Sequence, residues 1–119
     1  MDKNCTVFRT LELVGKKWTL LIVLELYKAG QNGLRYNELK NSLPGATSRI
    51  LSARLKEMQA KQLIKRKVLS KKIPVKSFYY LTDSGLALVE IIKDLKKWAL
   101  KWKIHNKECE KKDCKDCEL

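Results

Sequence analysis

Histidine and glycine are scarce in this chain, and their scarcity removes most catalytic designs. The 119 residues include one His, His105, close to the C-terminal end, and five Gly. A Ser-His-Asp set therefore cannot form within the main domain, and no Gly-rich loop is present that would cradle a phosphate. A reactive Cys in that domain would also lack a His to activate it. We therefore expect a protein that is not an enzyme.

Long apolar runs are missing as well. The longest, residues 20–24, is far too short to cross a bilayer. The N-terminal sequence Met-Asp-Lys-Asn-Cys lacks the apolar segment of a signal peptide. We expect a cytoplasmic protein that has no membrane partner.

Acidic residues are few relative to basic ones. The chain has 13 acidic and 26 basic residues, a net charge of +13. Residues 105–119 hold four Lys and five acidic residues, so residues 1–104 carry the whole excess, +14. A domain this basic attracts polyanions, of which nucleic acid is the commonest. Affinity for a membrane surface, or a general richness in Lys, is the alternative.

Apolar periodicity predicts two helices near the N-terminus. Residues 6–14 form the first, for which Gly15 suits a left-handed C-cap. Residues 18–28 form the second, because apolar side chains recur every three to four positions. The buried stripe of this second helix is predicted to contain Trp18, Leu21, Ile22 and Leu26. Leu34 and Arg35 are a candidate short strand.

Residues 34–62 predict a short helix, a tight turn and a longer helix. The turn is Pro44-Gly45, and Thr47 or Ser48 caps the second helix. This is the helix-turn-helix pattern. The core face of the second helix is predicted to contain Ile50, Leu51, Leu55 and Met58.

The opposite face of that helix is small, hydroxylic and basic. Small side chains allow close approach to base edges, while Arg and Lys reach guanine or phosphate. A solvated amphipathic helix would show the same pattern, and Arg54, at the edge of the apolar face, could instead hold a carboxylate within the fold. The residues predicted to meet the major groove are Thr47, Ser48, Arg49, Ser52, Ala53 and Lys56.

A β-hairpin is predicted to follow. Residues 63–69 are β-branched and basic, and residues 77–82 are aromatic. The tip between them carries Lys71, Lys72 and Lys76, which could reach phosphates or the minor groove. A hairpin placed directly after a recognition helix is the wing of a winged helix; a solvated loop is the alternative.

The last predicted helix starts at the cap Thr82-Asp83-Ser84 and runs to Trp102. Its apolar stripe is long enough to predict a coiled-coil-like dimer seam, with packing on its own domain alone as the alternative. The stripe consists of Leu88, Ile91, Ile92, Leu95, Trp98, Ala99 and Trp102. The predicted fold is thus mainly α with a small β-hairpin, a winged helix-turn-helix that dimerises through its N- and C-terminal helices.

Four ordered motifs run along the chain. They are Gly15-Lys16-Lys17-Trp18-Thr19-Leu20-Leu21-Ile22, Arg35-Tyr36-Asn37-Glu38-Leu39, Leu43-Pro44-Gly45, and Ser48-Arg49-Ile50-Leu51-Ser52-Ala53-Arg54-Leu55-Lys56-Glu57. With Cys5 before the first helix and Trp98 in the last, the sequence resembles the HxlR-type winged-helix transcription regulators, relatives of the MarR group. The resemblance covers about Cys5 to Trp102.

That resemblance implies a homodimer on double-stranded DNA, at a roughly palindromic operator. It adds Arg35 to the expected DNA contacts. Some members sense oxidants or electrophiles through the cysteine at the position of Cys5. A sensing thiol needs solvent access and nearby positive charge, which Lys3 and Arg9 could supply; an inert thiol is the alternative, and the effector stays unknown.

Residues 105–119 extend beyond the family pattern, so we divide the chain into a DNA-binding and dimerisation domain, residues 1–104, and a Cys-containing tail. The cysteines of the tail follow a Cys-x4-Cys-x2-Cys spacing, with His105 one helical turn before the first. Such a set suits zinc or an iron–sulfur cluster. A reversible thiol pair, or incidental cysteines, would give the same spacing. The candidate ligands are His105, Cys109, Cys114 and Cys117.

No cofactor is required by the sequence. Two alternative functions stay open beside the redox-responsive regulator. One is a metal- or iron–sulfur-binding sensor that uses the tail cysteines. The other is a winged helix that binds nucleic acid without sequence preference, or serves as an RNA- or protein-binding module.

Overall fold

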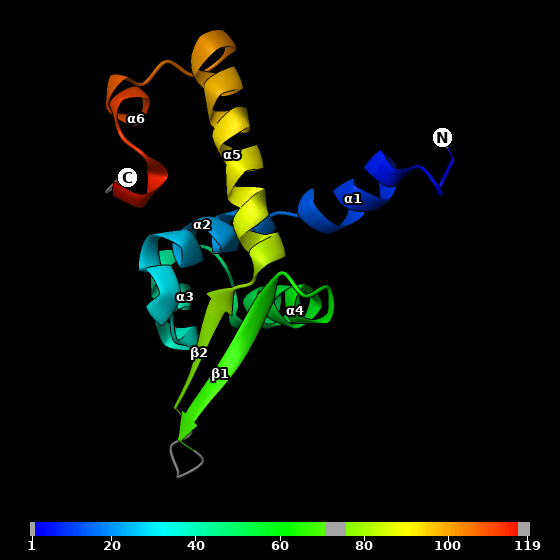
Figure 1. Ribbon diagram of the computed structural model, residues 1–119, viewed down its shortest axis with the longest axis vertical. Helices are drawn as coiled ribbons and strands as arrows, with labels where there is room; N and C mark the ends of the chain where they lie inside the picture. The colour runs from blue at the N-terminus through cyan, green and yellow to red at the C-terminus, as the bar shows by residue number, and fades with distance from the viewer. Residues whose placement is uncertain (1, 71–75, 117–119) are drawn as a thin grey trace.

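The computed structural model describes residues 2–70 and 76–116 (Figure 1). Helices dominate, and one antiparallel hairpin supplies the β structure, which confirms the predicted winged helix-turn-helix class. In chain order the elements are α1 (Thr6–Val14), α2 (Thr19–Ala29), η1 (Gly30–Asn32), α3 (Tyr36–Ser42), α4 (Ser48–Ala60), β1 (Ile64–Ser70), β2 (Lys76–Leu81), α5 (Asp83–Trp102), α6 (Lys107–Lys111) and η2 (Cys114–Asp116). Within the described ranges, no helix is both long and apolar enough to cross a membrane.

The core lies where α2, α3 and α4 meet the base of the hairpin and the start of α5. It forms because each helix turns one apolar stripe inward, as the sequence periodicity predicts. The fully buried side chains at its centre include Ile22, Leu26, Leu39, Leu51, Leu55, Met58, Ile64 and Val89.

The prediction for α2 was right about Ile22 and Leu26 and wrong about Leu21, which is 43% exposed. Trp18 precedes the helix in a left-handed conformation, with φ 85°, so the helix begins at Thr19. Each residue along a helix turns the side-chain direction by about 100°, so Leu21 falls outside the buried arc. Thr19 and Val23 complete the buried face.

The left-handed cap predicted at Gly15 was also wrong. Gly15 has φ −79° and its N–H donates to the Leu11 carbonyl at 2.9 Å, so it continues the helical hydrogen-bond pattern of α1. The left-handed conformation occurs three residues later, at Trp18. Gly15 therefore extends α1 by one hydrogen bond.

The hairpin pairs Ile64 with Leu81 and Arg66 with Tyr79. Leu34 joins the same sheet through a single bridge to Tyr79, where each backbone N–H donates to the other residue's carbonyl at 2.9 and 2.8 Å. The candidate strand at Leu34 and Arg35 is therefore one bridge rather than a strand. Two residues of the predicted tip, Lys71 and Lys72, lie outside the described residues.

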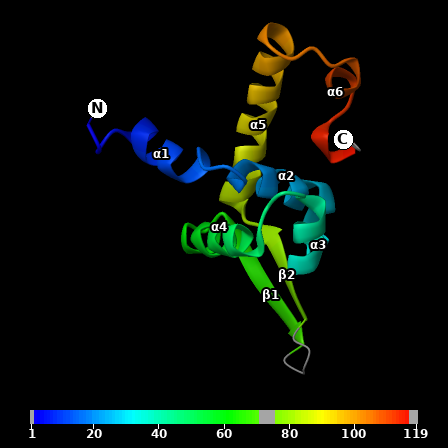
Figure 2. The same cartoon turned by 180° about the vertical axis from the view of Figure 1, so that it is seen from behind.

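Two helices extend away from this core (Figures 1 and 2). The first turns of α5 contribute Val89 and Ile92 to the core, and the rest of the helix rises beyond it. Helix α1 projects sideways and has no buried residue. The chain then folds back from the end of α5, so that η2 lies against α2.

Candidate nucleic-acid interface

Helix α4 is the central element of the candidate interface, and its first turn is fixed by a local hydrogen bond. The Thr47 hydroxyl accepts a hydrogen bond from the Ile50 N–H at 3.1 Å, which satisfies one of the free donors at the helix start. Leu51, Leu55 and Met58 anchor the opposite side in the core. The predicted cap is confirmed, and so are three of the four predicted core residues, whereas Ile50 is only half-buried. The cap and the buried stripe together set which side of α4 meets solvent.

The solvent side of α4 carries five of the residues that the sequence predicts as DNA contacts. They lie at positions i, i+1, i+4, i+5 and i+8, which share one helical face. All are exposed: Ser48, Arg49, Ser52, Ala53 and Lys56. The face combines one small Ala side chain and two hydroxyl groups with two cationic side chains. Small side chains allow close approach to a base edge, and cations suit contact with guanine or phosphate.

Arg54 has the alternative role that the sequence allowed, which is to pair with a carboxylate of its own fold. It is half-buried, and its Nη1 lies 4.0 Å from Glu57 Oε2. The same carboxylate oxygen lies 2.6 Å from Lys16 Nζ. Arg54 therefore belongs to an ion-pair cluster inside the fold and is separate from the exposed face.

Sequence reasoning missed one residue of the interface, Tyr36. Its hydroxyl donates to the Ser48 carbonyl at 3.1 Å and accepts a hydrogen bond from Ser52 Oγ at 3.2 Å. The Ser52 hydroxyl hydrogen is therefore used within the fold, and the oxygen of this exposed residue keeps its capacity to accept a hydrogen bond. The partners are 12 and 16 residues apart, so no local pattern signals the contact.

Arg35 lies just before Tyr36, at the start of α3. Its backbone N–H donates to Glu38 Oε1 at 3.0 Å, and the residue is exposed. The Glu38 carboxylate thereby caps α3 from its first turn. Because this backbone is fixed, the Arg35 side chain begins next to Tyr36, the residue that contacts α4.

The hairpin supplies further positive charge. Lys76, at the start of β2, is exposed, and so are Lys65, Arg66 and Lys67 along β1. The β1 cations were recognised as strand residues in the sequence and were not assigned to the interface. A cationic hairpin beside the α4 face extends the surface on which a phosphate backbone would be favoured.

Cys5 occupies the N-cap position of α1 and is a free, partly exposed thiol. Its carbonyl accepts a hydrogen bond from the Arg9 N–H at 3.0 Å. The apolar side of the same helix is uncovered, with Val7 59% and Leu11 56% exposed. The thiol thus lies on a helix that its own domain does not enclose.

The apolar stripe predicted on α5 divides into two parts. Ile92 is buried and Leu88 is half-buried, so both pack on their own domain. Ile91, Leu95, Trp98 and Trp102 are between 51% and 64% exposed. Their spacing of four, three and four residues is that of a coiled-coil seam.

The tail does not bring its candidate ligands together in the described part of the chain. His105 lies between α5 and α6, Cys109 in α6, and Cys114 at the start of η2, whereas Cys117 lies outside the described residues. Within residues 2–70 and 76–116, no group of three or more His, Cys, Asp or Glu side chains could hold a metal ion. The four-residue ligand set stays a prediction.

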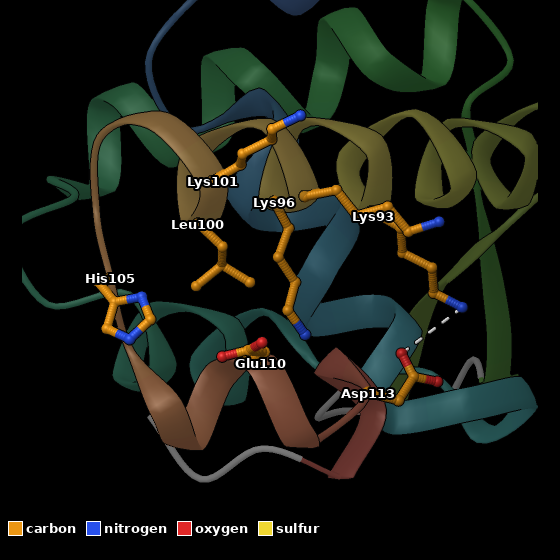
Figure 3. A pocket seen from close by; sticks show the side chains of 8 residues that line it. Lys93, Lys96, Leu100, Lys101, His105, Glu110 and Asp113 are labelled. Atoms are coloured by element: carbon orange, nitrogen blue, oxygen red, sulfur yellow. Dashed lines mark ion pairs between the residues drawn. The ribbon is translucent and has the colours of Figure 1, made fainter.

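Asp113 attaches the tail to the body of the fold. Tyr27 Oη donates to Asp113 Oδ2 at 2.8 Å, and Lys93 Nζ lies 3.5 Å from Asp113 Oδ1. The hydrogen bond from Tyr27 lowers the pKa of Asp113, and the same bond raises the pKa of Tyr27. Figure 3 shows this ion pair at one end of a groove of about 720 Å³ between α5 and the tail, with His105 at the other end.

Comparisons with known proteins agree with this geometry. The model of the HxlR-like helix-turn-helix family matches residues 13–107. The HTH-type transcriptional regulator YvaP of Bacillus subtilis (strain 168) is 37% identical over 94 residues, which cover 79% of this chain and 83% of YvaP.

Two solved structures are similar over most of the fold. The reduced form of the transcriptional regulator YodB from B. subtilis has a TM-score of 0.71 and 30% identity, and the alignment covers 86% of this chain and 97% of that one. The redox regulator HypR in its oxidised form has a TM-score of 0.69 and 30% identity, with 84% and 99% covered.

Proposed function

Since the chain belongs to the HxlR-like helix-turn-helix family, whose members are transcriptional regulators and not enzymes, we propose that it binds operator DNA as a homodimer, with α4 in the major groove. The observation that carries this proposal is the exposed face of α4. Arg49 and Lys56 flank small and hydroxylic side chains on a helix whose opposite side is fixed in the core. This role places the protein in the cytoplasm, with the DNA it regulates.

Charge supports DNA as the partner. Residues 1–104 carry the entire positive excess of the chain. Exposed cations on α4 and on the hairpin would neutralise phosphates and release counterions, so affinity falls steeply as salt rises. In this arrangement Arg49 and Lys56 meet the major groove, where Arg49 reads a base, while Lys76 and the tip residues Lys71 and Lys72 contact the backbone.

The exposed stripe of α5 supports the homodimer. Four large apolar side chains at seam spacing, two of them Trp, are costly to leave in water. A second copy would present the same stripe in a symmetric interface. Two α4 helices would then reach half-sites about 34–36 Å apart, one turn of DNA.

Cys5 supports a redox input. A peroxide would oxidise the Cys5 thiolate to sulfenic acid; the peroxide O–O bond breaks, one oxygen joins the sulfur, and the other leaves as hydroxide or alkoxide. Two observations favour this step: Cys5 is free and partly exposed, and the similar structures include a redox regulator. Cys5 would sense, and α4 would respond.

A titration against the DNA upstream of the chain's own gene tests the proposal, at two salt concentrations and with non-specific competitor present. Wild-type protein should bind saturably despite the competitor. Arg49→Ala should lose about 1–3 kcal/mol of binding free energy and discriminate less between operator variants, because a base contact is lost. Lys97→Ala, which removes one exposed cation from α5, is the charge-matched control and should retain specificity.

Wild-type affinity in Arg49→Ala would show that the recognition face is misplaced. Binding that competitor abolishes in wild-type protein would favour the sequence-independent alternative. The same titration after peroxide treatment tests whether Cys5 is the redox sensor. Oxidation should weaken the operator affinity of wild-type protein and leave the operator affinity of Cys5→Ser unchanged. A Cys5→Ser variant that still responds would exclude Cys5 as the sensor.

A further inference from the structure

The connection between α1 and α2, residues 15–18, lies against both ends of α4. Lys16 Nζ forms an ion pair with Glu57 Oε2 in the last turns of α4, at 2.6 Å. Trp18 lies against the turn before α4: a Cβ added to Gly45 would be 3.5 Å from Cη2 of the indole ring. One short connection therefore contacts α4 near its C-terminal end and the turn at its N-terminal end.

The Lys16–Glu57 pair is short and partly shielded from solvent. The two side chains are 42% and 26% exposed, and a charge-assisted bond of this length is among the stronger polar contacts. Arg54, the other cation at the same oxygen, is more distant at 4.0 Å. Among the described residues, Glu57 Oε1 and Arg54 Nε are buried without a hydrogen-bond partner, so Lys16 supplies the main contact of this carboxylate.

Trp18, which lies against Gly45, has an unusual backbone conformation. Its φ of 85° is rare for a bulky residue and persists only where the surroundings fix it. The indole packs against the core cluster, and Lys17 Nζ lies 4.9 Å from its ring centre. The direction in which the chain leaves α1 is thus tied to the position of the turn that precedes α4.

Helix α1 has few ties of its own to the domain. It has no buried residue, and a groove of about 570 Å³ separates it from the end of α4. Among the described residues, Lys16–Glu57 is the single ion pair between residues 2–18 and α4. In the proposed dimer the partner subunit would therefore set the direction of α1.

We propose that Lys16 and Trp18 are positioning residues that transmit the direction of α1 to α4. A shift of α1, whether set by the partner subunit or by chemistry at Cys5, moves both contacts together and so tilts the recognition helix relative to the core. This inference rests on the proposed function and deepens it, because it names the route from the dimer arm to the DNA-binding face.

The test compares four variants of the full chain. Lys16→Met removes the charge and keeps an unbranched side chain. Lys16→Arg keeps the charge and is the conservative rescue. Lys61→Met is the matched control, because Lys61 lines the same groove and makes no ion pair among the described residues. Glu57→Gln removes the carboxylate charge from the other side, and serves if Lys16→Met does not fold.

Three readouts separate coupling from folding. Amide hydrogen exchange in residues 48–60 should rise in Lys16→Met and stay at the wild-type level in Lys16→Arg and Lys61→Met. Operator affinity should fall about 2- to 30-fold in Lys16→Met, with the same rescue. The ratio of the operator affinity of the reduced protein to that of the oxidised protein should move towards one in Lys16→Met, because a shift of α1 no longer changes the position of α4.

Wild-type exchange and affinity in both Lys16→Met and Glu57→Gln would overturn the inference. Equal losses in Lys16→Met and Lys61→Met would overturn it as well, since the effect would then be general electrostatics. If wild-type protein binds no specific DNA, the proposed function fails, and the exchange of residues 48–60 still decides whether Lys16 positions α4.

Discussion

At the scale of single residues, two glycines with the same backbone angle have different surroundings. Gly30 and Gly33 have φ +72° and +71°, in a region that side-chain-bearing residues rarely adopt. A Cβ on Gly30 would meet nothing within 4 Å, whereas a Cβ on Gly33 would lie 2.2 Å from the Tyr79 carbonyl oxygen. Gly33 therefore permits the close approach that allows Leu34 to pair with Tyr79.

We predict that Gly33→Ala destabilises the fold more than Gly30→Ala. Both variants should lose about 1–3 kcal/mol of unfolding free energy through backbone strain. Gly33→Ala should lose more, because the added methyl group displaces the Tyr79 carbonyl and its bridge to Leu34. Urea unfolding of the two variants measures the difference; equal midpoints would show that the bridge adds no stability.

At the scale of elements, the tail is attached by a small polar cluster rather than by a core. η2 lies against α2, and Asp113 receives the Tyr27 hydrogen bond and the Lys93 ion pair. Neither η2 nor α6 has a buried residue in its described part. Because exposed polar contacts contribute little stability, the tail should detach without unfolding the domain.

We predict that docking of the tail depends on pH at both extremes. The Tyr27 hydrogen bond is the first cause of the lowered pKa of Asp113. The ionised Asp113 therefore stabilises the docked tail at any pH above the ordinary pKa of Asp, and this stabilisation is lost as the pH falls through the lowered pKa. The hydrogen bond to Asp113 is the first cause of the raised pKa of Tyr27. The protonated Tyr27 therefore stabilises the docked tail at any pH below the ordinary pKa of Tyr, and this stabilisation is lost as the pH rises through the raised pKa.

The NMR signals of residues 107–116 across a pH titration measure this docking. Tyr27→Phe should detach the tail at a higher pH on the acid side, since Asp113 loses the bond that lowers its pKa. Glu110→Gln removes a nearby carboxylate that makes no ion pair among the described residues, and should behave as wild type. Identical titrations of Tyr27→Phe and wild type would assign the docking to other contacts.

At the scale of the whole molecule, the apolar stripe of α5 is left exposed to solvent. Ile91, Leu95, Trp98 and Trp102 stand on one side of a helix that rises clear of the core (Figure 1). A monomer would leave these side chains in water, whereas a symmetric dimer would cover them.

We predict that Leu95→Glu converts the protein to a monomer. Charges placed opposite one another in a seam would have to be buried unpaired, which costs far more than the lost apolar contact. Sedimentation velocity measures the assembly, and operator affinity should fall with it because the half-sites are then bound separately. Lys97→Glu, a charge change at a polar position of the same helix, is the control; a dimeric Leu95→Glu would mean that α5 is not the seam.

The local features of this protein follow from the sequence by itself. The Thr47 cap and the stripe of Leu51, Leu55 and Met58 depend on residues three to four positions apart. The hairpin after α4 follows from two strand-like segments that are neighbours in the chain. Periodicity and capping act at that range, so the winged helix and the composition of the α4 face could be predicted. The error at Leu21 has another cause. Ile22 and Leu26 were placed correctly, whereas Leu21 lies about 100° from Ile22 around α2, outside the arc that packs on the core.

Only the tertiary structure decided the contacts between elements. Tyr36 with Ser52, Lys16 with Glu57, and Tyr27 with Asp113 join residues 16, 41 and 86 positions apart. No periodic pattern records such pairs, because each depends on how two separately formed elements pack and on which rotamers that packing leaves open. The chain's local chemistry thus determined the small, hydroxylic and cationic face of α4, and its tertiary packing decided what holds that face in position.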